Sequence, residues 1–331
     1  MHKHHKEEPV ASSESLDLPG QPEKTKPSGI QLAVRILRAP FFTATAVPVC
    51  VGAAVAWWQG YFHLGYFALT LIGAVAIHAG LNVANDYFDH LSGNDEAHPH
   101  PTPFSGGSRV IQEGLVTPRQ MLAISVAAFA LGAAIGLFLA ATRGWMVLWL
   151  GLAGAFFAVF NSAPPLKLSY RGHGLAELGV GLGFGPIPVL GTYYVQAQHL
   201  SLEALWASIP VAILIVAILY INEFPDYEAD KAVGKQTPVV VLGRKRAVWG
   251  YAGLMIANYV AIVLEFWLNL IPTLALLAVI TAPLAYRAVR RALKFHSSIE
   301  ELIPANAATI NIHLATGIFL CLAYLVPWPF I

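Results

Sequence analysis

Residues 65–95 read GYFALTLIGAVAIHAGLNVANDYFDHLSGND, and this stretch sets the fold class. Its first part, residues 65–84, contains no Asp, Glu, Lys or Arg. A helix of about 20 predominantly apolar residues is long enough to span the hydrocarbon core of a bilayer. Acidic residues begin directly afterwards, at Asp86 and Asp89. The pattern therefore predicts a membrane-spanning helix that runs into an acidic motif at the membrane surface.

Eight further stretches of this kind occur along the chain. Only 12% of the 331 residues are charged, against about 25% in typical soluble domains. Glu265 is the one formal charge inside any of the nine stretches, and it lies near an end. The sequence therefore predicts an all-α polytopic membrane protein. The expected spans are Ala39–Trp58, Gly65–Ala84, Met121–Thr142, Gly144–Asn161, Leu178–Gln198, Ala204–Asn222, Ala247–Trp267, Leu268–Tyr286 and Thr309–Pro327.

The basic residues indicate how these spans are oriented. Of the 20 Lys and Arg residues, only Arg143 lies outside the leading segment and the connections that follow even-numbered spans. Short basic connections stay in the cytoplasm. We therefore expect a bacterial-type cytoplasmic membrane protein with a cytoplasmic amino terminus and an external carboxyl terminus. Residues 1–29 are polar and should form a disordered cytoplasmic tail before one membrane-embedded domain, 30–331.

The charge balance also limits the partners. The formal net charge is +1, whereas nucleic-acid-binding domains carry a basic excess. We expect contact with membrane lipid, no nucleic-acid partner and no obligate protein partner.

A second acidic motif matches the first. NEFPDYEAD, at Asn222–Asp230, and NDYFDHLSGND, at Asn85–Asp95, both begin with Asn followed four residues later by Asp. Each motif begins where an even-numbered span is expected to reach the cytoplasm. This correspondence predicts a parallel internal repeat of two four-helix halves, with a ninth helix added.

Helical spacing places the polar side chains of each motif on one face, because residues four apart on a helix are neighbours. The stacked residues are His78, Asn82, Asn85 and Asp89 in the first motif, and Asn222, Asp226 and Asp230 in the second. We also expect Pro225 to open a short new helical segment beyond the membrane, since proline is tolerated in a first helical turn. Two glycine pairs, Gly132/Gly136 and Gly181/Gly185, have the spacing of a close helix-packing contact.

Carboxylates gathered in this way repel one another unless a cation lies between them. Oxygen ligands without a Cys partner suit Mg²⁺, which is commonly shared with substrate phosphates. Basic residues that could contact phosphate occur on the same expected side of the membrane. They are Arg109, in the turn Gly106–Arg109, and Lys167, Arg171, Lys231 and Lys235. The combination predicts a diphosphate held between Mg²⁺ and basic side chains.

The two motifs resemble the Asp-rich signatures of the UbiA superfamily of intramembrane prenyltransferases. The resemblance covers about residues 34–328 and is greatest to the branch that acts on 1,4-dihydroxy-2-naphthoate. Four segments carry that likeness: SGGSRVIQEGLVTP, PPLKLSYRGHGLAELG, GTYYVQ and DYEADKAVGKQT. The sequence departs from the superfamily at Pro225, where many members have Arg, and at Ala39, which separates Arg38 from Pro40.

The resemblance implies a set of site residues. The catalytic set is Asn85, Asp89, Asp95, Asp226 and Asp230, of which the four Asp residues would bind Mg²⁺. The substrate-binding set is Arg38, Asn82, Asp86, Arg109, Lys167, Tyr170, Asn222 and Lys235.

The implied reaction transfers a polyprenyl group from a polyprenyl diphosphate to an aromatic acceptor. The first expected acceptor is 1,4-dihydroxy-2-naphthoate, in menaquinone biosynthesis, with release of CO₂ and diphosphate. Other acceptors of the superfamily are 4-hydroxybenzoate, homogentisate and a prenylated glycerol phosphate. An alternative of another class is a secondary transporter, because internal repeats and many spans are common there. Transporter sites lie near the membrane midplane, however, whereas these acidic clusters lie at one edge.

Overall fold

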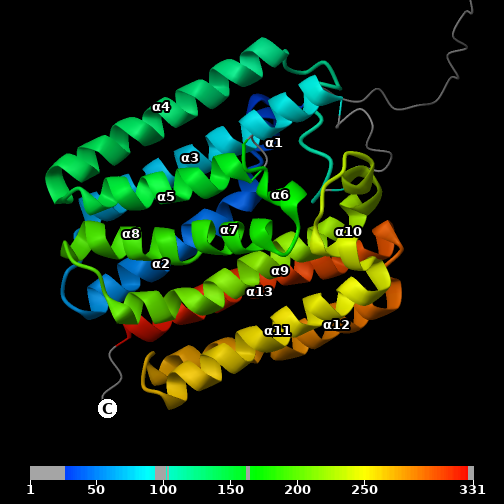
Figure 1. Ribbon diagram of the computed structural model, residues 1–331. Helices are drawn as coiled ribbons and strands as arrows, with labels where there is room; N and C mark the ends of the chain where they lie inside the picture. The colour runs from blue at the N-terminus through cyan, green and yellow to red at the C-terminus, as the bar shows by residue number, and fades with distance from the viewer. Residues whose placement is uncertain (1–26, 94–101, 103, 162–164, 327–331) are drawn as a thin grey trace, which may run out of the picture.

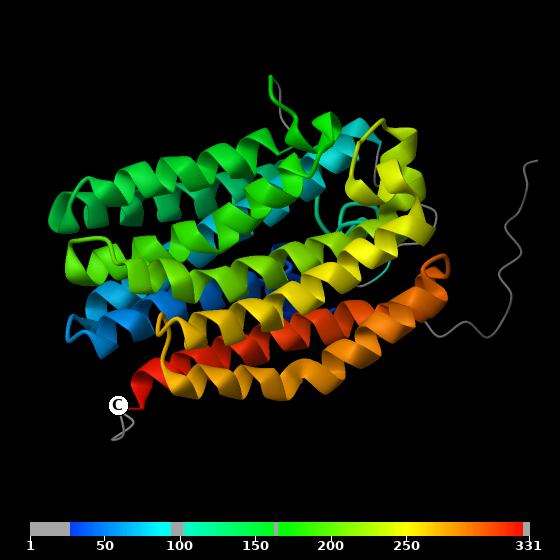
Figure 2. The same ribbon diagram turned by 60° about the horizontal axis from the view of Figure 1, so that its bottom comes forward.

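The computed structural model describes residues 27–93, 102, 104–161 and 165–326, and over these residues the chain is helical with one isolated bridge, Thr102–Ser105. The long helices run back and forth side by side in a single bundle (Figures 1 and 2). In chain order the helices are α1 (Gly29–Leu37), η1 (Ala39–Phe42), α2 (Thr43–Trp58), α3 (Leu64–Ser92), α4 (Pro118–Arg143), α5 (Met146–Phe160), α6 (Leu168–Arg171), α7 (Leu175–Phe184), α8 (Pro186–Ala197), α9 (Leu202–Ala232), α10 (Pro238–Leu242), α11 (Arg244–Trp267), η2 (Thr273–Thr281), α12 (Ala282–Phe295) and α13 (Ile299–Leu325). The predicted all-helical class is confirmed.

Eight helical segments of the described chain are long and apolar enough to cross a membrane. Each corresponds to one of the nine expected spans. The remaining expected span, Gly144–Asn161, is α5, an apolar helix of 15 residues. At 1.5 Å per residue, α5 is about 22 Å long, shorter than the ~30 Å hydrocarbon core.

Both acidic motifs lie on helices that continue past their predicted ends. The expected spans stop at Ala84 and Asn222, whereas α3 continues to Ser92 and α9 to Ala232. Charged side chains end an apolar run, but backbone hydrogen bonding continues through them. The expectation that Pro225 opens a new helix is therefore wrong, because Pro225 lies inside α9.

The fifth expected span, Leu178–Gln198, is two helices, α7 and α8, that meet at Gly185. A Cβ atom at Gly185 would lie 2.5 Å from Cβ of Ala212 in α9, so the two backbones approach too closely for any side chain. Gly181 packs in the same way, with its would-be Cβ 2.8 Å from Val216. The predicted close packing is confirmed at Gly181 and Gly185, and at Gly132, where a Cβ would lie 2.6 Å from Ile77. It is wrong at Gly136, where a Cβ would meet no atom within 4 Å. The sequence missed the break because Gly185 lies within an apolar run.

The end of the bundle that carries α6 and α10 also carries the carboxyl ends of α3 and α9 (Figure 1). A small apolar cluster fixes α1 and the connection after α3 against α3 and α4 at this end. The cluster comprises Ile36, Val83, Val110, Val116 and Met121. α1 and this connection are thereby held against the carboxyl half of α3.

The opposite end contains Arg143, the one basic residue outside the expected pattern. Its guanidinium donates from Nε to the carbonyl oxygen of Val195, at 2.6 Å, and from NH2 to that of Gln196, at 2.7 Å. These carbonyls belong to the last turn of α8, where cations are favoured by the helix dipole. Arg143 therefore serves to close a helix end.

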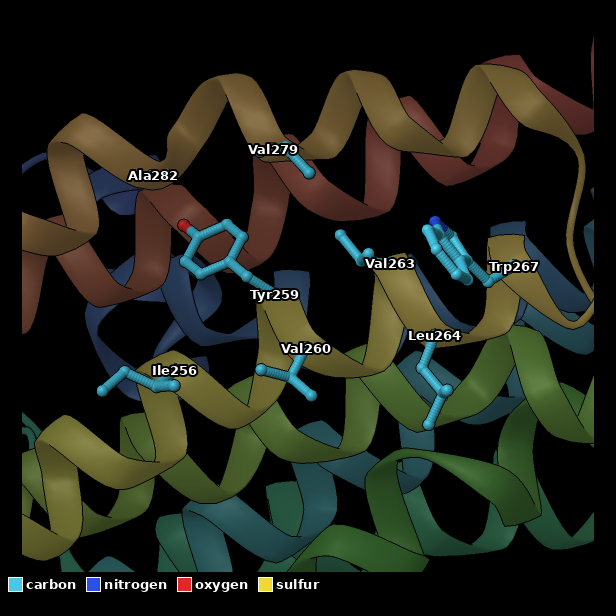
Figure 3. A pocket seen from close by; sticks show the side chains of 8 residues that line it. All are labelled: Ile256, Tyr259, Val260, Val263, Leu264, Trp267, Val279 and Ala282. Carbon is cyan, nitrogen blue, oxygen red and sulfur yellow. The ribbon is translucent and has the colours of Figure 1, made fainter.

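An apolar groove of about 530 Å³ lies on α11, η2 and the first residue of α12 (Figure 3). Its lining consists of Ile256, Tyr259, Val260, Val263, Leu264, Trp267, Val279 and Ala282. None of these residues belongs to either acidic motif. Exposed apolar side chains are expected where a spanning helix contacts lipid, so we assign this groove to the lipid-facing surface and not to the active site.

Candidate active site

A cavity of about 130 Å³ lies where α3, α9 and the connections that follow them meet. Its lining consists of Arg38, Asn85, Asp89, Phe104, Ser105, Gly106, Gly107, Asp226, Ala229, Asp230 and Lys235. The fold thus brings residues of both acidic motifs to one polar cavity, together with two of the predicted basic residues.

On the α3 side, an amide holds a carboxylate in place. Nδ2 of Asn85 donates to Oδ2 of Asp89 at 2.8 Å. The two residues are four apart on one helix, so the predicted stacking accounts for the contact. The Asp89 carboxylate is therefore presented to the cavity in a defined position.

On the α9 side, Lys235 pairs with the motif. Its Nζ lies 2.8 Å from Oδ1 of Asp230. Burial alone would lower the pKa of Lys235, but the carboxylates of Asp230, Asp89 and Asp226 outweigh burial and raise this pKa. Lys235 consequently stays a cation, and its ammonium group interacts electrostatically with carboxylates from both α3 and α9.

The donor set fits a hard cation that is shared with a phosphate ligand. Within the described residues, no three His, Cys, Asp or Glu side chains converge closely enough to hold an ion by themselves. Mg²⁺ characteristically takes one or two carboxylates and completes its shell with water and substrate phosphates. Carboxylates from two helices that line one polar cavity, together with Lys235 and Arg38, suit that arrangement.

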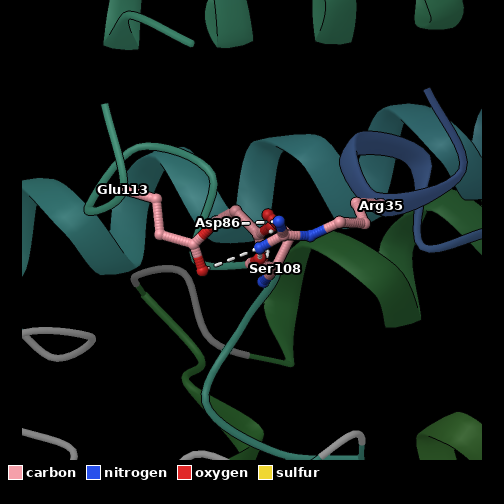
Figure 4. Close-up of polar contacts among 4 residues, drawn as sticks. All are labelled: Arg35, Asp86, Ser108 and Glu113. Atoms are coloured by element: carbon pink, nitrogen blue, oxygen red, sulfur yellow. Dashed lines mark hydrogen bonds and ion pairs between the residues drawn. The ribbon is translucent and has the colours of Figure 1, made fainter. Parts of the chain in front are cut away.

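Asp86 lies behind the cavity and organises its rim. It is 2% exposed, and its Oδ2 accepts a hydrogen bond from the backbone N–H of Ser108 at 3.1 Å (Figure 4). Its Oδ1 lies 3.5 Å from NH1 of Arg38. Asp86 therefore ties the connection after α3, and a cavity-lining arginine, to the motif helix.

A second arginine holds the same connection from outside. NH1 and NH2 of Arg35 donate to the carboxylate of Glu113, each at 2.9 Å, and NH2 also donates to the carbonyl oxygen of Ser108 at 3.1 Å (Figure 4). Gly106 and Gly107 adopt positive φ angles of 81° and 71° in this segment. That left-handed backbone suits glycine and lets the turn pass over the cavity.

Five of the other predicted site residues do not line the cavity: Asn82, Arg109, Lys167, Tyr170 and Asn222. Asn82 donates from Nδ2 to the carbonyl oxygen of Leu37 at 3.1 Å and so fixes the end of α1. Nζ of Lys167 lies 5.2 Å from the centre of the Tyr170 ring. Asp95 is outside the described residues.

Asn306, on α13, is a contributor that sequence reasoning left out of the site. Proline has no N–H, so Pro225 cannot donate to the carbonyl of Ile221 one turn earlier. Nδ2 of Asn306 donates instead to that carbonyl at 3.3 Å, and to Oδ1 of Asn222 at 2.7 Å. This substitution of partners explains how α9 continues through Pro225. The available signal was an amide three residues before the start of the ninth expected span.

Replacing Asn306 by Leu should destabilise the protein by about 1–3 kcal/mol, because the buried Ile221 carbonyl loses its donor. The thermal midpoint in detergent, followed by tryptophan fluorescence, measures the loss. Asn311→Leu is the matched control, because Asn311 is an exposed residue of the same helix. Equal midpoints for the two variants would contradict this role of Asn306.

The sequence matches a known protein family over most of its length. The model of the UbiA prenyltransferase family matches residues 45–310. The chain belongs to the UbiA prenyltransferase family. It is therefore a multi-pass membrane enzyme, and the transporter alternative is set aside.

Named relatives of this UbiA-family protein act on naphthoates or naphthoquinones. The 2-carboxy-1,4-naphthoquinone phytyltransferase of Synechocystis sp. is 28% identical over 303 residues, which cover 91% of this chain and 95% of the relative. The 1,4-dihydroxy-2-naphthoate octaprenyltransferase of Mycobacterium tuberculosis is 34% identical over 253 residues, covering 76% and 79%.

Solved UbiA structures share the fold. A UbiA homolog from Archaeoglobus fulgidus bound to GPP and Mg²⁺ superposes with a TM-score of 0.56 at 17% identity. The match covers 87% of this chain and 99% of that one. The helical architecture is therefore that of the UbiA family over nearly its whole length.

Proposed function

We propose that this UbiA-family enzyme transfers a polyprenyl group from a polyprenyl diphosphate to 1,4-dihydroxy-2-naphthoate, as in menaquinone biosynthesis. The observation that carries the proposal is the polar cavity lined by Asp89, Asp226, Asp230 and Lys235 at one end of apolar helices. Such a site suits a substrate with a charged head and a hydrocarbon tail. The two naphthoate- and naphthoquinone-specific relatives support the choice of acceptor.

The residues of the cavity divide the work of cleaving the diphosphate. Asp89, Asp226 and Asp230 are the candidate carboxylate ligands, of which one or two would bind Mg²⁺ together with water and the substrate phosphates. When bound, Mg²⁺ would supply charge that neutralises the departing diphosphate. Lys235 and Arg38 present cationic donors to the same oxygens, and preorganised charges of this kind favour the transition state. The allylic carbon thereby loses its diphosphate and gains carbocation character.

The apolar helices serve the second half of the reaction. They keep the polyprenyl tail in hydrocarbon and exclude water, which would otherwise add to the cation. The electron-rich ring forms a bond from its carboxylate-bearing carbon to the allylic carbon. The carboxylate then leaves as CO₂, and its bonding electron pair returns to the ring. Diphosphate and CO₂ are the two by-products.

We further infer that α5 supplies a ninth crossing, which completes two repeated four-helix halves and an added helix. Figure 1 shows α5 starting at the end of the bundle where α4 finishes and running beside the long helices toward α6. An odd number of crossings agrees with the distribution of basic residues. With nine crossings, the amino-terminal tail 1–29 is cytoplasmic and the carboxyl terminus is external. The active site, within the domain 30–331, then faces the cytoplasm.

The acceptor assignment is tested by giving purified protein labelled farnesyl, geranylgeranyl and longer diphosphates with each candidate acceptor. We expect a decarboxylated prenyl-naphthalenediol with 1,4-dihydroxy-2-naphthoate, at least about tenfold faster than with 4-hydroxybenzoate or homogentisate, since a site that hydrogen-bonds one acceptor discriminates against others. Mass spectrometry of the products measures the ratio. Prenylation of 4-hydroxybenzoate alone would overturn the assignment.

A further inference from the structure

His78 is a buried polar residue of α3 that the proposed catalytic machinery does not use. It shares a helix face with Asn85 and Asp89, which line the cavity. Seven residues separate His78 from Asn85, so the imidazole lies about 10 Å further along the helix, toward the apolar middle of the bundle. The side chain is 7% exposed.

Three other elements fix the orientation of this imidazole. The ring of Phe42, from η1, lies edge-on with a centroid distance of 5.5 Å, and that of Phe184, from α7, lies edge-on at 5.2 Å. Nδ1 is 2.7 Å from Oγ1 of Thr45, on α2. Phe184 is the last residue before the break at Gly185, so the local end of α7 sets its position. The imidazole is therefore held by one hydrogen bond between two aromatic rings.

The other ring nitrogen is left available. In the described part of the chain, the hydrogen bond of His78 is the one made by Nδ1. Nε2 of His78 is not fully enclosed by protein atoms. Both ring nitrogens of His313, by contrast, are fully enclosed and have no hydrogen-bond partner. Buried polar groups normally have a partner. Among the described residues, Nε2 of His78 thus has no hydrogen-bond partner and is partly accessible, so it can bind a ligand.

The position of His78 relates this nitrogen to the cavity. Arg38, which lines the cavity, immediately precedes η1, and η1 carries the Phe42 ring that packs against His78. Asn82 lies one helical turn from His78 on the same face and one turn from Asp86. A substrate whose diphosphate occupies the cavity and whose tail enters the bundle would carry its allylic carbon toward this level.

We propose that Nε2 of His78 hydrogen-bonds the hydroxyl of the aromatic acceptor and holds the acceptor ring beside the allylic carbon. Phe42 and Phe184 offer the edge and face contacts that a flat aromatic ring prefers. A hydroxyl that donates to the imidazole also leaves more electron density on the ring carbons that attack. His78 is then a catalytic residue that touches the acceptor, and this role rests on the proposed function.

Three variants of the full-length enzyme test the role. His78→Phe keeps an aromatic ring but removes both nitrogens, His78→Gln places an amide near the position of Nε2, and His78→Asn places one near Nδ1. We expect kcat/KM for the acceptor to fall roughly 10- to 100-fold in His78→Phe and His78→Asn, because one buried hydrogen bond is lost. His78→Gln should retain most of the activity. KM for the prenyl diphosphate should stay unchanged in all three.

The assay uses the aromatic acceptor that the unmodified enzyme prenylates, so two failures can be told apart. Normal acceptor kcat/KM in His78→Phe would overturn the role of His78 alone. Equal rescue by Asn and Gln would also overturn it, because the bond to Thr45 would then be the important one. Equal loss toward acceptor and diphosphate would indicate a packing defect and overturn it as well. Absence of any aromatic product from the unmodified enzyme would overturn the proposed function and, with it, this inference.

Discussion

Asp89→Ala and Asp226→Ala should each lower turnover by at least about 1000-fold, because a charge-stabilising group that acts in the transition state is worth 10²–10³ in rate and a cation ligand is lost as well. The two residues line one cavity from different helices, so neither substitutes for the other. Product formation at saturating Mg²⁺ and substrates measures the loss. The thermal midpoint of each variant shows whether the protein remains folded.

Glu228→Gln is the control for these variants. Glu228 follows Asp226 by two residues on α9, its side chain is 66% exposed, and it pairs with Arg244 at 3.2 Å. Exposed pairs contribute little to stability, so turnover and midpoint should match those of the unmodified enzyme. Substantial activity in either Asp→Ala variant would refute the assignment of the two motifs to one catalytic site.

Removing Mg²⁺ should have an effect of similar size. With EDTA, turnover should fall to the background of the assay and return when Mg²⁺ is added in excess, since the carboxylates would otherwise repel the diphosphate. EDTA saturated beforehand with Mg²⁺ controls for the chelator itself. A second readout is the thermal midpoint with inorganic diphosphate, which should rise only when Mg²⁺ is also present. Prenyl transfer that EDTA leaves untouched would refute the metal mechanism.

Eight of the nine expected spans correspond to helices long and apolar enough to cross a bilayer, because these apolar runs are long and nearly free of charge. Their ends were less predictable. The first acidic residues end the hydrophobic run of α3 and α9, but the helices continue, since charged side chains do not interrupt backbone hydrogen bonds. The break at Gly185 was missed for the opposite reason, because it depends on close approach to Ala212 in α9 and leaves no change in hydrophobicity.

Contacts in the site between residues close in sequence were likewise predictable, whereas contacts between residues far apart in sequence were not. The proximity of Asn85 and Asp89 follows from their spacing, because residues four apart on a helix are neighbours. The two repeated motifs indicated that their helices contribute to one site. The bond from Asn306 to the carbonyl of Ile221 joins residues 85 positions apart. The placement of Asp86 under Ser108 likewise depends on how the connection after α3 folds back. Backbone partners of this kind have no sequence signature.

The unbroken course of α3 through Asn85 and Asp89, and of α9 through Asn222 to Asp230, gives the cavity a rotational register. On an α-helix each residue turns the chain by about 100°. A one-residue insertion between the membrane and Asp89 or Asp226 would swing that carboxylate out of the cavity, whereas the connection over the cavity is a loop that can change length. During evolution, insertions and deletions should accordingly be tolerated after the motifs and rejected before them. The number of residues between the membrane and each motif Asp is therefore constrained.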